Sequence, residues 1–137
     1  MDLVLKSKLK EFVFDVVGAC INVRSALGPY LNEYMYQDAL EIEFRESGIE
    51  HVKEYYFSAT YRGQVIKHRH YADFLVKDSI LLECKAVENI GIEQRQQLWN
   101  YMRLSGIKVG VLYNFAPFKP QCERYYIADA TSTPIAF

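Results

Sequence analysis

The stretch from Tyr71 to Ala86 contains two apolar runs that are joined by Lys77-Asp78-Ser79 and interrupted by charges at strand spacing. We expect residues 71–76 and 80–86 to pair as an antiparallel hairpin around that three-residue loop, because this register gathers the apolar side chains on one face. A two-residue loop would instead turn Glu83 onto the apolar face. The expected apolar face carries three cross-strand pairs, which are Ala72 with Cys84, Phe74 with Leu82 and Val76 with Ile80.

The opposite face of this hairpin places two carboxylates together. Asp73 lies directly opposite Glu83 there, with Cβ atoms about 5 Å apart, and like charges in this position destabilise a sheet unless something neutralises them. A divalent cation with oxygen ligands can do so, and so can the ammonium of Lys85, which shares the side of Glu83. The pattern indicates either a metal-binding acidic site beside a lysine or a solvated face with a cross-strand salt bridge, and spacing alone does not separate the two.

The composition suits one folded domain without a broad basic surface. A chain of 137 residues with 50% hydrophobic content can bury a core, and we expect one domain over residues 1–137. Sixteen basic and seventeen acidic residues give a net charge of −1, so any contact with nucleic acid must be local. The three cysteines lack zinc-type spacing, and the sequence shows neither a signal peptide nor a long apolar span. We therefore expect a reduced, soluble, cytoplasmic protein that does not enter membranes.

Hydrophobic periodicity and turn residues predict two helices, a three-stranded meander, a helix and two more strands. The first helix covers residues 6–27 and stops at Gly28-Pro29, and the second starts near Asn32, which is suited to an N-cap, and continues to Gly48. The remaining elements are strands at about 52–61, 65–76 and 79–87, a helix at about 93–105 that ends at Gly106, and strands at 108–115 and 124–128.

Three further polar side chains have positions that suit a site. Glu33 begins the second helix, where the helix dipole favours a negative charge, but it also falls on the inward stripe with Tyr36. Gln97 and Tyr101 are four residues apart on the third predicted helix and so point the same way, which suits hydrogen bonds to a phosphate, a base or a carboxylate. Each of these patterns also occurs on ordinary helix surfaces.

Two other candidate groups are less convincing from the residues themselves. His68, Arg69 and His70 form a basic cluster, but consecutive strand residues alternate faces, so the three side chains are badly placed to chelate one ion. Cys84 projects to the apolar face in the expected register, which favours a small core residue over a nucleophile. No Ser/His/Asp arrangement or glycine-rich phosphate loop is evident.

The order of elements, with an aspartate and a Glu-x-Lys on successive strands, resembles the PD-(D/E)XK nuclease superfamily. Asp73, Glu83 and Lys85 match its core signature. Within it, the chain is similar to the small GxxExxY proteins over roughly residues 15–129. The blocks that carry this likeness are Leu27-Gly28-Pro29, Glu33-x-x-Tyr36, Tyr71-Ala72-Asp73, Leu82-Glu83-Cys84-Lys85-Ala86-Val87 and Gln97-Leu98-x-x-Tyr101.

The resemblance implies an α/β fold with a mixed sheet of about five strands flanked by helices, and divalent-metal-dependent hydrolysis of phosphodiester bonds in DNA or RNA. Asp73 and Glu83 would hold Mg²⁺ or Mn²⁺ with the backbone carbonyl of Cys84, and Glu33 would bind a second metal directly or through water. Lys85 would act on the attacking water. The substrate-binding positions implied in the same way are Gln97, Tyr101 and Tyr36.

The sequence departs from the family pattern at two positions. Tyr30 stands where the naming motif has its glycine, which leaves the turn before Glu33 less free in its backbone angles. Ala72 replaces the proline expected before the first aspartate. The first departure concerns the shape of the loop and not the acidic residues.

Two other interpretations of the sequence stay open. One is a catalytically inactive nuclease-fold module that binds or regulates within a larger complex. The other is a structural domain in which Lys85 and Arg69 compensate the carboxylates, and which forms a homodimer through aromatic residues such as Tyr55, Tyr56 and Phe57.

Overall fold

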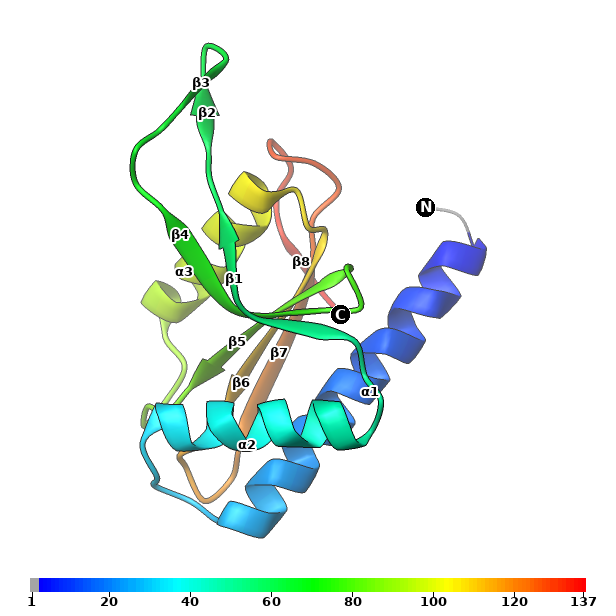
Figure 1. Cartoon of the computed structure of the whole chain (residues 1–137), viewed down its shortest axis with the longest axis vertical. Coiled ribbons are helices and arrows are strands. Elements are labelled where there is room, and N and C mark those ends of the chain that lie inside the picture. Colours follow the sequence, from blue (N-terminus) through cyan, green and yellow to red (C-terminus); the bar gives the residue numbers. More distant parts are fainter. Residues whose placement is uncertain (1–2) are drawn as a thin grey trace.

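A six-stranded mixed sheet, in the order β1-β4-β5-β6-β7-β8, forms the centre of the computed structural model, which describes residues 3–137 (Figure 1). Strands β5 and β6 are parallel, and the other neighbours are antiparallel. The α/β fold with a mixed sheet is as expected, with one strand more. The strands are β1 (His51–Phe57), β4 (His70–Val76), β5 (Ile80–Lys85), β6 (Val109–Asn114), β7 (Gln121–Tyr126) and β8 (Ile135–Ala136).

Helices cover both faces of this sheet. Helices α1 (Leu3–Leu27) and α2 (Glu33–Glu46) pack on one face, and α3 (Ile92–Ser105) packs on the other (Figure 1). Each face has its own buried core, because strands that are covered on both sides bury alternate side chains in opposite directions. No helix among residues 3–137 is long and apolar enough to cross a bilayer.

The predicted helix ends are largely confirmed. Asn32 is the N-cap residue of α2, and Gly106 ends α3 in the left-handed conformation that glycine adopts at low cost. Helix α1 starts at Leu3, ahead of the expected residue 6, and α2 ends at Glu46, short of Gly48. These differences lie at helix ends, where the pattern of apolar residues is weakest.

The hairpin register is confirmed over three residue pairs, Phe74 with Leu82, Leu75 with Leu81 and Val76 with Ile80. The core on the side of α1 and α2 contains Phe74 and Cys84, as predicted. Ala72 differs from the prediction, because it packs in the core on the side of α3. The reason is a distortion of the strand at Asp73, which is described below.

The two long strands predicted at 52–61 and 65–76 are both interrupted. Their far ends form a separate hairpin of β2 (Thr60–Tyr61) and β3 (Gln64–Val65), which stands away from the main sheet (Figure 1). We call residues 58–69 the arm. Residues 61–69 are all exposed, so no core holds them in the sheet. The tip residues Arg62 and Gly63 have φ of 50° and 74°, the signs that a type I′ turn needs.

The last predicted strand is shifted. It was expected at 124–128 and lies at Gln121–Tyr126, because it pairs along the full length of β6 from Asn114 with Gln121 to Val109 with Tyr126. The short edge strand β8 then pairs with β7 and was not expected from the sequence. A two-residue strand carries too little alternation to be recognised.

Candidate active site

Asp73 lies where β4 is distorted between its two neighbouring strands. The pairing of β1 with β4 keeps one register from His51 to Phe57, but the pair Glu54 with Asp73 is missing from the ladder, and Glu54 has a φ of 55°. Ala72 and Leu75, three residues apart, both face the core beneath α3. The strand therefore changes its alternation at Asp73, and a non-glycine residue with positive φ opposite it marks backbone strain of the kind found at functional sites.

The two carboxylates of the hairpin replace part of the backbone ladder. The amide N–H of Asp73 donates to Glu83 Oε1 at 3.1 Å, and the amide N–H of Cys84 donates to Asp73 Oδ2 at 2.8 Å. Each carboxylate therefore accepts a hydrogen bond, through one of its oxygens, from a backbone amide of the opposite strand. The other oxygens, Asp73 Oδ1 and Glu83 Oε2, accept no amide hydrogen bond from the described residues. The juxtaposition that the sequence predicted is present.

Burial makes two charges in this place costly. Glu83 is 3% exposed, and burial raises its pKa well above the usual range, with the neighbouring Asp73 charge acting in the same direction. Burial also raises the pKa of Asp73, while the amide of Cys84 and the charge of Lys85 oppose that rise. Without a cation the pair favours a shared proton, and with a cation both groups can ionise.

Lys85 reaches from the end of β5 to α3. Its Nζ donates to Gln97 Oε1 at 2.6 Å, and Gln97 Nε2 donates to the hydroxyl of Tyr101 at 3.3 Å. Burial raises the pKa of Tyr101, and the charge of Glu83 adds to the effect. The structure therefore joins Lys85, Gln97 and Tyr101 in one hydrogen-bonded chain beside the acidic pair. The sequence indicated the pairing of Gln97 with Tyr101 but not the contact with Lys85.

Glu33 approaches the same place from the other face of the sheet. It lies in the first turn of α2, and burial raises its pKa, with the charge of Asp73 acting in the same direction and that of Lys85 opposing it. Among residues 3–137, no group of three or more His, Cys, Asp or Glu side chains is close enough to hold one metal ion, so Glu33 does not complete a three-carboxylate cluster with the pair. His68 and His70 belong to no such group within residues 3–137.

Tyr36 and Cys84 are buried. The Tyr36 hydroxyl donates to the carbonyl of Gly28 at 2.7 Å and accepts from the amide of Leu31 at 3.1 Å, and the side chain is fully shielded from solvent. It therefore anchors the loop that leads to Glu33 and does not face a substrate. The Cys84 side chain is buried in the core, and burial raises the pKa of its thiol well above the usual range, so only its backbone is suited to the site.

In the loop before Glu33, Tyr30 adopts a left-handed backbone conformation that favours glycine. Tyr30 has a φ of 63°, and its amide donates to the carbonyl of Ala116 at 2.9 Å. The ring of Tyr30 meets Phe118 edge-on, with ring centroids 5.4 Å apart. The departure from the family motif thus leaves a strained tyrosine in the loop.

Two residues that support the site were not identified from the sequence. Asn114 is fully buried and binds the backbone of Val87 on both sides, with Val87 N donating to Asn114 Oδ1 at 3.0 Å and Asn114 Nδ2 donating to Val87 O at 2.9 Å. It holds the chain just after Lys85. The sequence feature that could have pointed to Asn114 is its amide side chain, the lone amide in the otherwise apolar run 108–115. Glu54 gave no signal, because its strain depends on the neighbouring strand.

The donor set suits a hard divalent cation. Two carboxylates that are close together, partly desolvated and each left with one oxygen free of amide donors are the ligands that Mg²⁺ and Mn²⁺ prefer. A cleft of about 580 Å³ lies against α3 and is lined by residues that include Gln97, Tyr101 and His70. Neither carboxylate lines it, and Gln97, which accepts from Lys85, links the cleft to the site.

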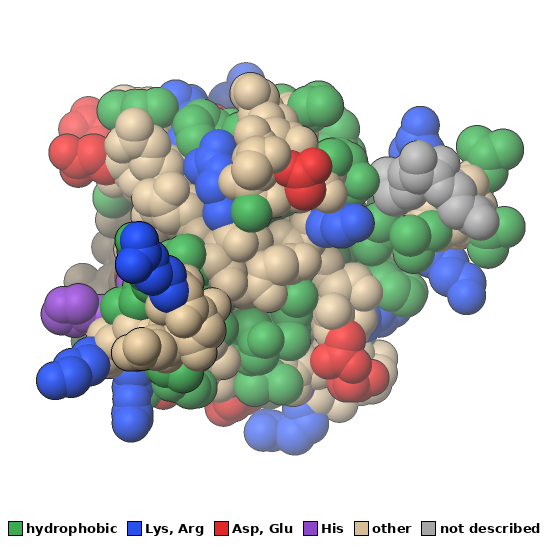
Figure 2. Space-filling view, turned by 90° about the horizontal axis from the view of Figure 1, so that it is seen from above, with side chains coloured by type: hydrophobic (Ala, Val, Ile, Leu, Met, Phe, Trp, Pro, Cys, Tyr) green, Lys and Arg blue, Asp and Glu red, His purple; other side chains and the backbone are tan. Residues whose placement is uncertain are grey.

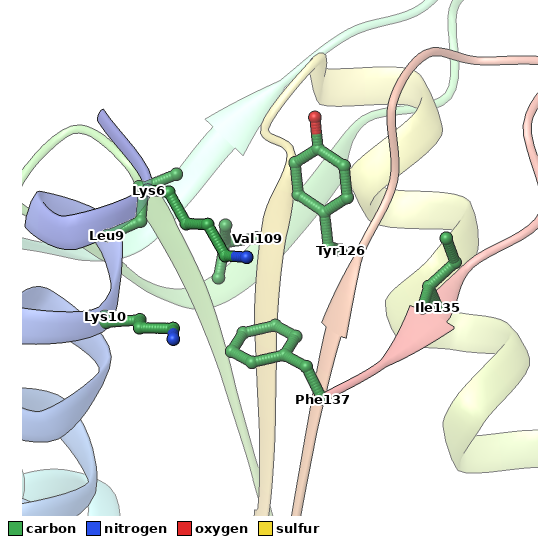
Figure 3. Close-up of a pocket in the computed structure, with 7 residues that line it drawn as sticks. All are labelled: Lys6, Leu9, Lys10, Val109, Tyr126, Ile135 and Phe137. Atoms are coloured by element: carbon green, nitrogen blue, oxygen red, sulfur yellow. The ribbon is translucent and has the colours of Figure 1, made fainter. Parts of the chain in front are cut away.

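A second cavity lies away from the acidic pair. It has a volume of about 360 Å³ between α1 and the edge of the sheet, with Lys6 and Lys10 on one side and Tyr126, Ile135 and Phe137 on the other (Figure 3). None of the predicted site residues lines it. We therefore place the candidate active site at Asp73 and Glu83 and not in this cavity.

Comparisons with known proteins agree with this geometry. A family model for the PD-(D/E)XK nuclease superfamily matches residues 10–125. The crystal structure of the protein SSO0001 is similar in fold, with a TM-score of 0.56 at 19% identity over 67% of this chain, and the chain spans about half (48%) of the length of that protein. No curated protein matches the sequence. By its fold, its acidic pair and the family match over most of its length, the chain belongs to the PD-(D/E)XK nuclease superfamily.

Proposed function

We propose that this protein is a divalent-metal-dependent nuclease that hydrolyses phosphodiester bonds of DNA or RNA. The observation that carries the proposal is the close pair of half-buried Asp73 and buried Glu83, whose hydrogen bonds and raised pKa values suit a site where a cation would let both carboxylates ionise. Members of the superfamily generally use divalent metals. Asp73, Glu83 and the carbonyl of Cys84 would hold Mg²⁺ or Mn²⁺, which supplies a Lewis acid for the phosphoryl oxygen.

We assign roles to the remaining residues that their contacts support. Lys85 orients the attacking water and stabilises charge on the phosphate, and Gln97 holds the Lys85 ammonium in position. Tyr101 supports Gln97 and lines the cleft, where a substrate would lie. Glu33 adds negative charge at the other side of the acidic pair and would act on a second metal through water. Tyr36 contributes by anchoring the loop before Glu33.

We also infer that the chain belongs with the small GxxExxY proteins within the superfamily. Glu33 and Tyr36 of the naming motif have separate functions in this geometry, one facing the acidic pair and the other fastening the loop. The positive φ of Tyr30 supports this assignment, because the motif has glycine at that position.

The proposal is tested by incubating the protein with single- and double-stranded DNA and RNA, with Mg²⁺, Mn²⁺ or EDTA. We expect metal-dependent cleavage, a loss of about a hundredfold or more in Lys85→Ala, and no change in Lys8→Ala, which removes an exposed lysine near the start of α1, outside the site. Full activity of Lys85→Ala would contradict the assigned chemistry.

One observation favours the alternative of a nuclease-fold module without turnover. In the described part of the chain the acidic pair lacks a third carboxylate close enough for a shared metal. Such a module would bind nucleic acid or a partner complex but show no metal-dependent cleavage of any of the four substrates, so the same experiment separates the two functions.

A further inference from the structure

The arm, residues 58–69, carries basic side chains and no acidic ones. Between Glu54 and Asp73 the sequence contains no Asp or Glu, yet it contains Arg62, Lys67 and Arg69, in a chain with a net charge of −1. All three are exposed. Figure 2 looks onto the tip of the arm and shows Lys, Arg and His side chains gathered around it.

No carboxylate in residues 3–137 forms an ion pair with these three side chains. Instead, the Arg62 guanidinium lies 5.4 Å from the ring centre of Tyr61, and that of Arg69 lies 5.5 Å from the ring centre of Tyr56. Stacking on a ring orients a guanidinium while leaving its N–H donors free. Exposed aromatic rings interleaved with arginines are typical of surfaces that bind nucleic acid.

The base of the arm continues into the candidate active site. His70 is the first residue of β4; its ring stacks on Phe57, with centroids 5.6 Å apart, and lies 5.8 Å from the ring of Tyr101. His70 and Tyr101 both line the cleft of about 580 Å³, as does Gln97, the partner of Lys85. Asp73 follows His70 by three residues on the same strand. The end of the arm therefore meets the cleft at His70, and the cleft is linked through Gln97 to Lys85, which lies beside the acidic pair.

We propose that the arm binds the sugar–phosphate backbone of a nucleic-acid strand and directs it across the cleft to Asp73 and Glu83. This inference rests on the proposed nuclease function. A row of exposed cations without acidic neighbours suits a polymer with regularly spaced negative charges. Gly63 at the tip is ten residues before Asp73, which at about 3.3 Å per residue allows a reach of roughly 33 Å, close to one turn of a duplex.

The test is binding measured by fluorescence anisotropy in EDTA, so that cleavage plays no part. The probes are one labelled 20-nucleotide sequence as single-stranded DNA, duplex DNA and single-stranded RNA. The arm variant is R62Q/K67Q/R69Q. The control variant is K6Q/K8Q/K10Q, which makes the same change in charge at exposed positions of α1. A second arm variant, R62K/R69K, changes the same arm but keeps all its charges. It shows whether a loss of binding comes from the lost charge or from misfolding of the arm.

We expect the arm variant to raise Kd at least tenfold on its best probe. Its slope of log K against log salt should flatten by about 2 to 3, because each lost phosphate contact removes about 0.7 to 0.9 from the slope. The control variant should stay within twofold of the wild type, and R62K/R69K should stay within about threefold. Equal losses in the arm and control variants, an unchanged Kd in the arm variant, or no binding of the wild type to any probe in 50 mM salt would each overturn the inference.

The experiments separate a failure of the arm inference from a failure of the proposed nuclease function. If the arm variant loses binding but the wild type cleaves nothing with Mg²⁺ or Mn²⁺, the arm is a binding surface and the nuclease proposal fails. If the wild type cleaves and the arm variant binds and cleaves equally well, the nuclease proposal stands and the arm inference fails. When both hold, cleavage by the arm variant should show a raised KM with kcat largely retained.

Discussion

Asp73 and Glu83 sit side by side on neighbouring strands, and the amide of Asp73 donates to the carboxylate of Glu83 at 3.1 Å. The bond stands where a regular sheet would have a backbone partner, and the ladder between β4 and β5 stops one residue earlier, at Phe74 with Leu82. The local sheet is therefore organised around two carboxylates that repel each other when ionised. A protein keeps such an arrangement at a cost in stability.

Replacing Asp73 by asparagine should not destabilise the metal-free protein. The amide oxygen can still accept from the N–H of Cys84, and the repulsion with Glu83 is removed, so we expect a change in the free energy of unfolding between zero and a gain of about 2 kcal/mol. Urea unfolding in EDTA measures it. Asp38→Asn is the control, because it breaks an exposed ion pair with Lys53 and should cost up to about 0.5 kcal/mol. A loss of several kcal/mol for Asp73→Asn would identify a structural ion-pair partner instead.

Mg²⁺ or Mn²⁺ should raise the melting temperature of the wild type. At about ten times Kd, mass action contributes about 1.4 kcal/mol, which corresponds to roughly 3–6 °C for a protein of this size. Asp73→Asn and Glu83→Gln should show no response, whereas Lys85→Gln should keep it, since Lys85 is not a ligand. Thermal melts with and without metal measure the shift. An equal shift in the wild type and in Asp73→Asn would remove the acidic pair from consideration as the metal site.

Without metal, the acidic pair should make the protein less stable as the pH rises. The folded state holds a proton on the pair whose pKa values are raised, whereas the unfolded chain releases it near its ordinary pKa. The native state thus binds more protons above about pH 4.5, and stability falls with pH until the folded pair has ionised. Urea midpoints in EDTA from pH 5 to 8 measure this effect.

The comparison with Glu83→Gln isolates this contribution. Glu123 has a lowered pKa because Arg95 hydrogen-bonds to it, so its contribution to stability is complete above the ordinary pKa of glutamate and stays nearly constant from pH 5 to 8. The difference in the free energy of unfolding between Glu83→Gln and the wild type should therefore widen toward pH 8. A gap that is constant with pH would show that the pair is not desolvated as the structure indicates.

Releasing Lys85 from α3 should slow cleavage more than it weakens binding. Gln97→Ala removes the acceptor of the Lys85 ammonium, and we expect kcat to fall about tenfold to a hundredfold with little change in KM. Gln97→Glu retains an acceptor at the same distance and should recover part of the rate. Steady-state kinetics on the preferred substrate measure both. A change confined to KM would indicate that Gln97 contacts the substrate and does not position Lys85.

Tyr30→Gly should be more stable than Tyr30→Ala. Both variants lose the contact with Phe118, but only glycine relieves the positive φ, and we expect a difference of about 1 kcal/mol after the entropy cost of glycine. Urea unfolding of the two variants gives the difference directly. A more stable alanine variant would mean that the loop before Glu33 relaxes at no cost.

Local patterns were enough to predict the hairpin register, the helix caps at Asn32 and Gly106, and the closeness of Asp73 and Glu83. These features depend on alternation with a period of two and on residues adjacent in the chain. The contact of Lys85 with Gln97, the approach of Glu33, the strain at Glu54 and the detachment of the arm depend on how helices and strands far apart in the chain pack together. That packing is decided by burial across the whole molecule, which short-range periodicity does not encode.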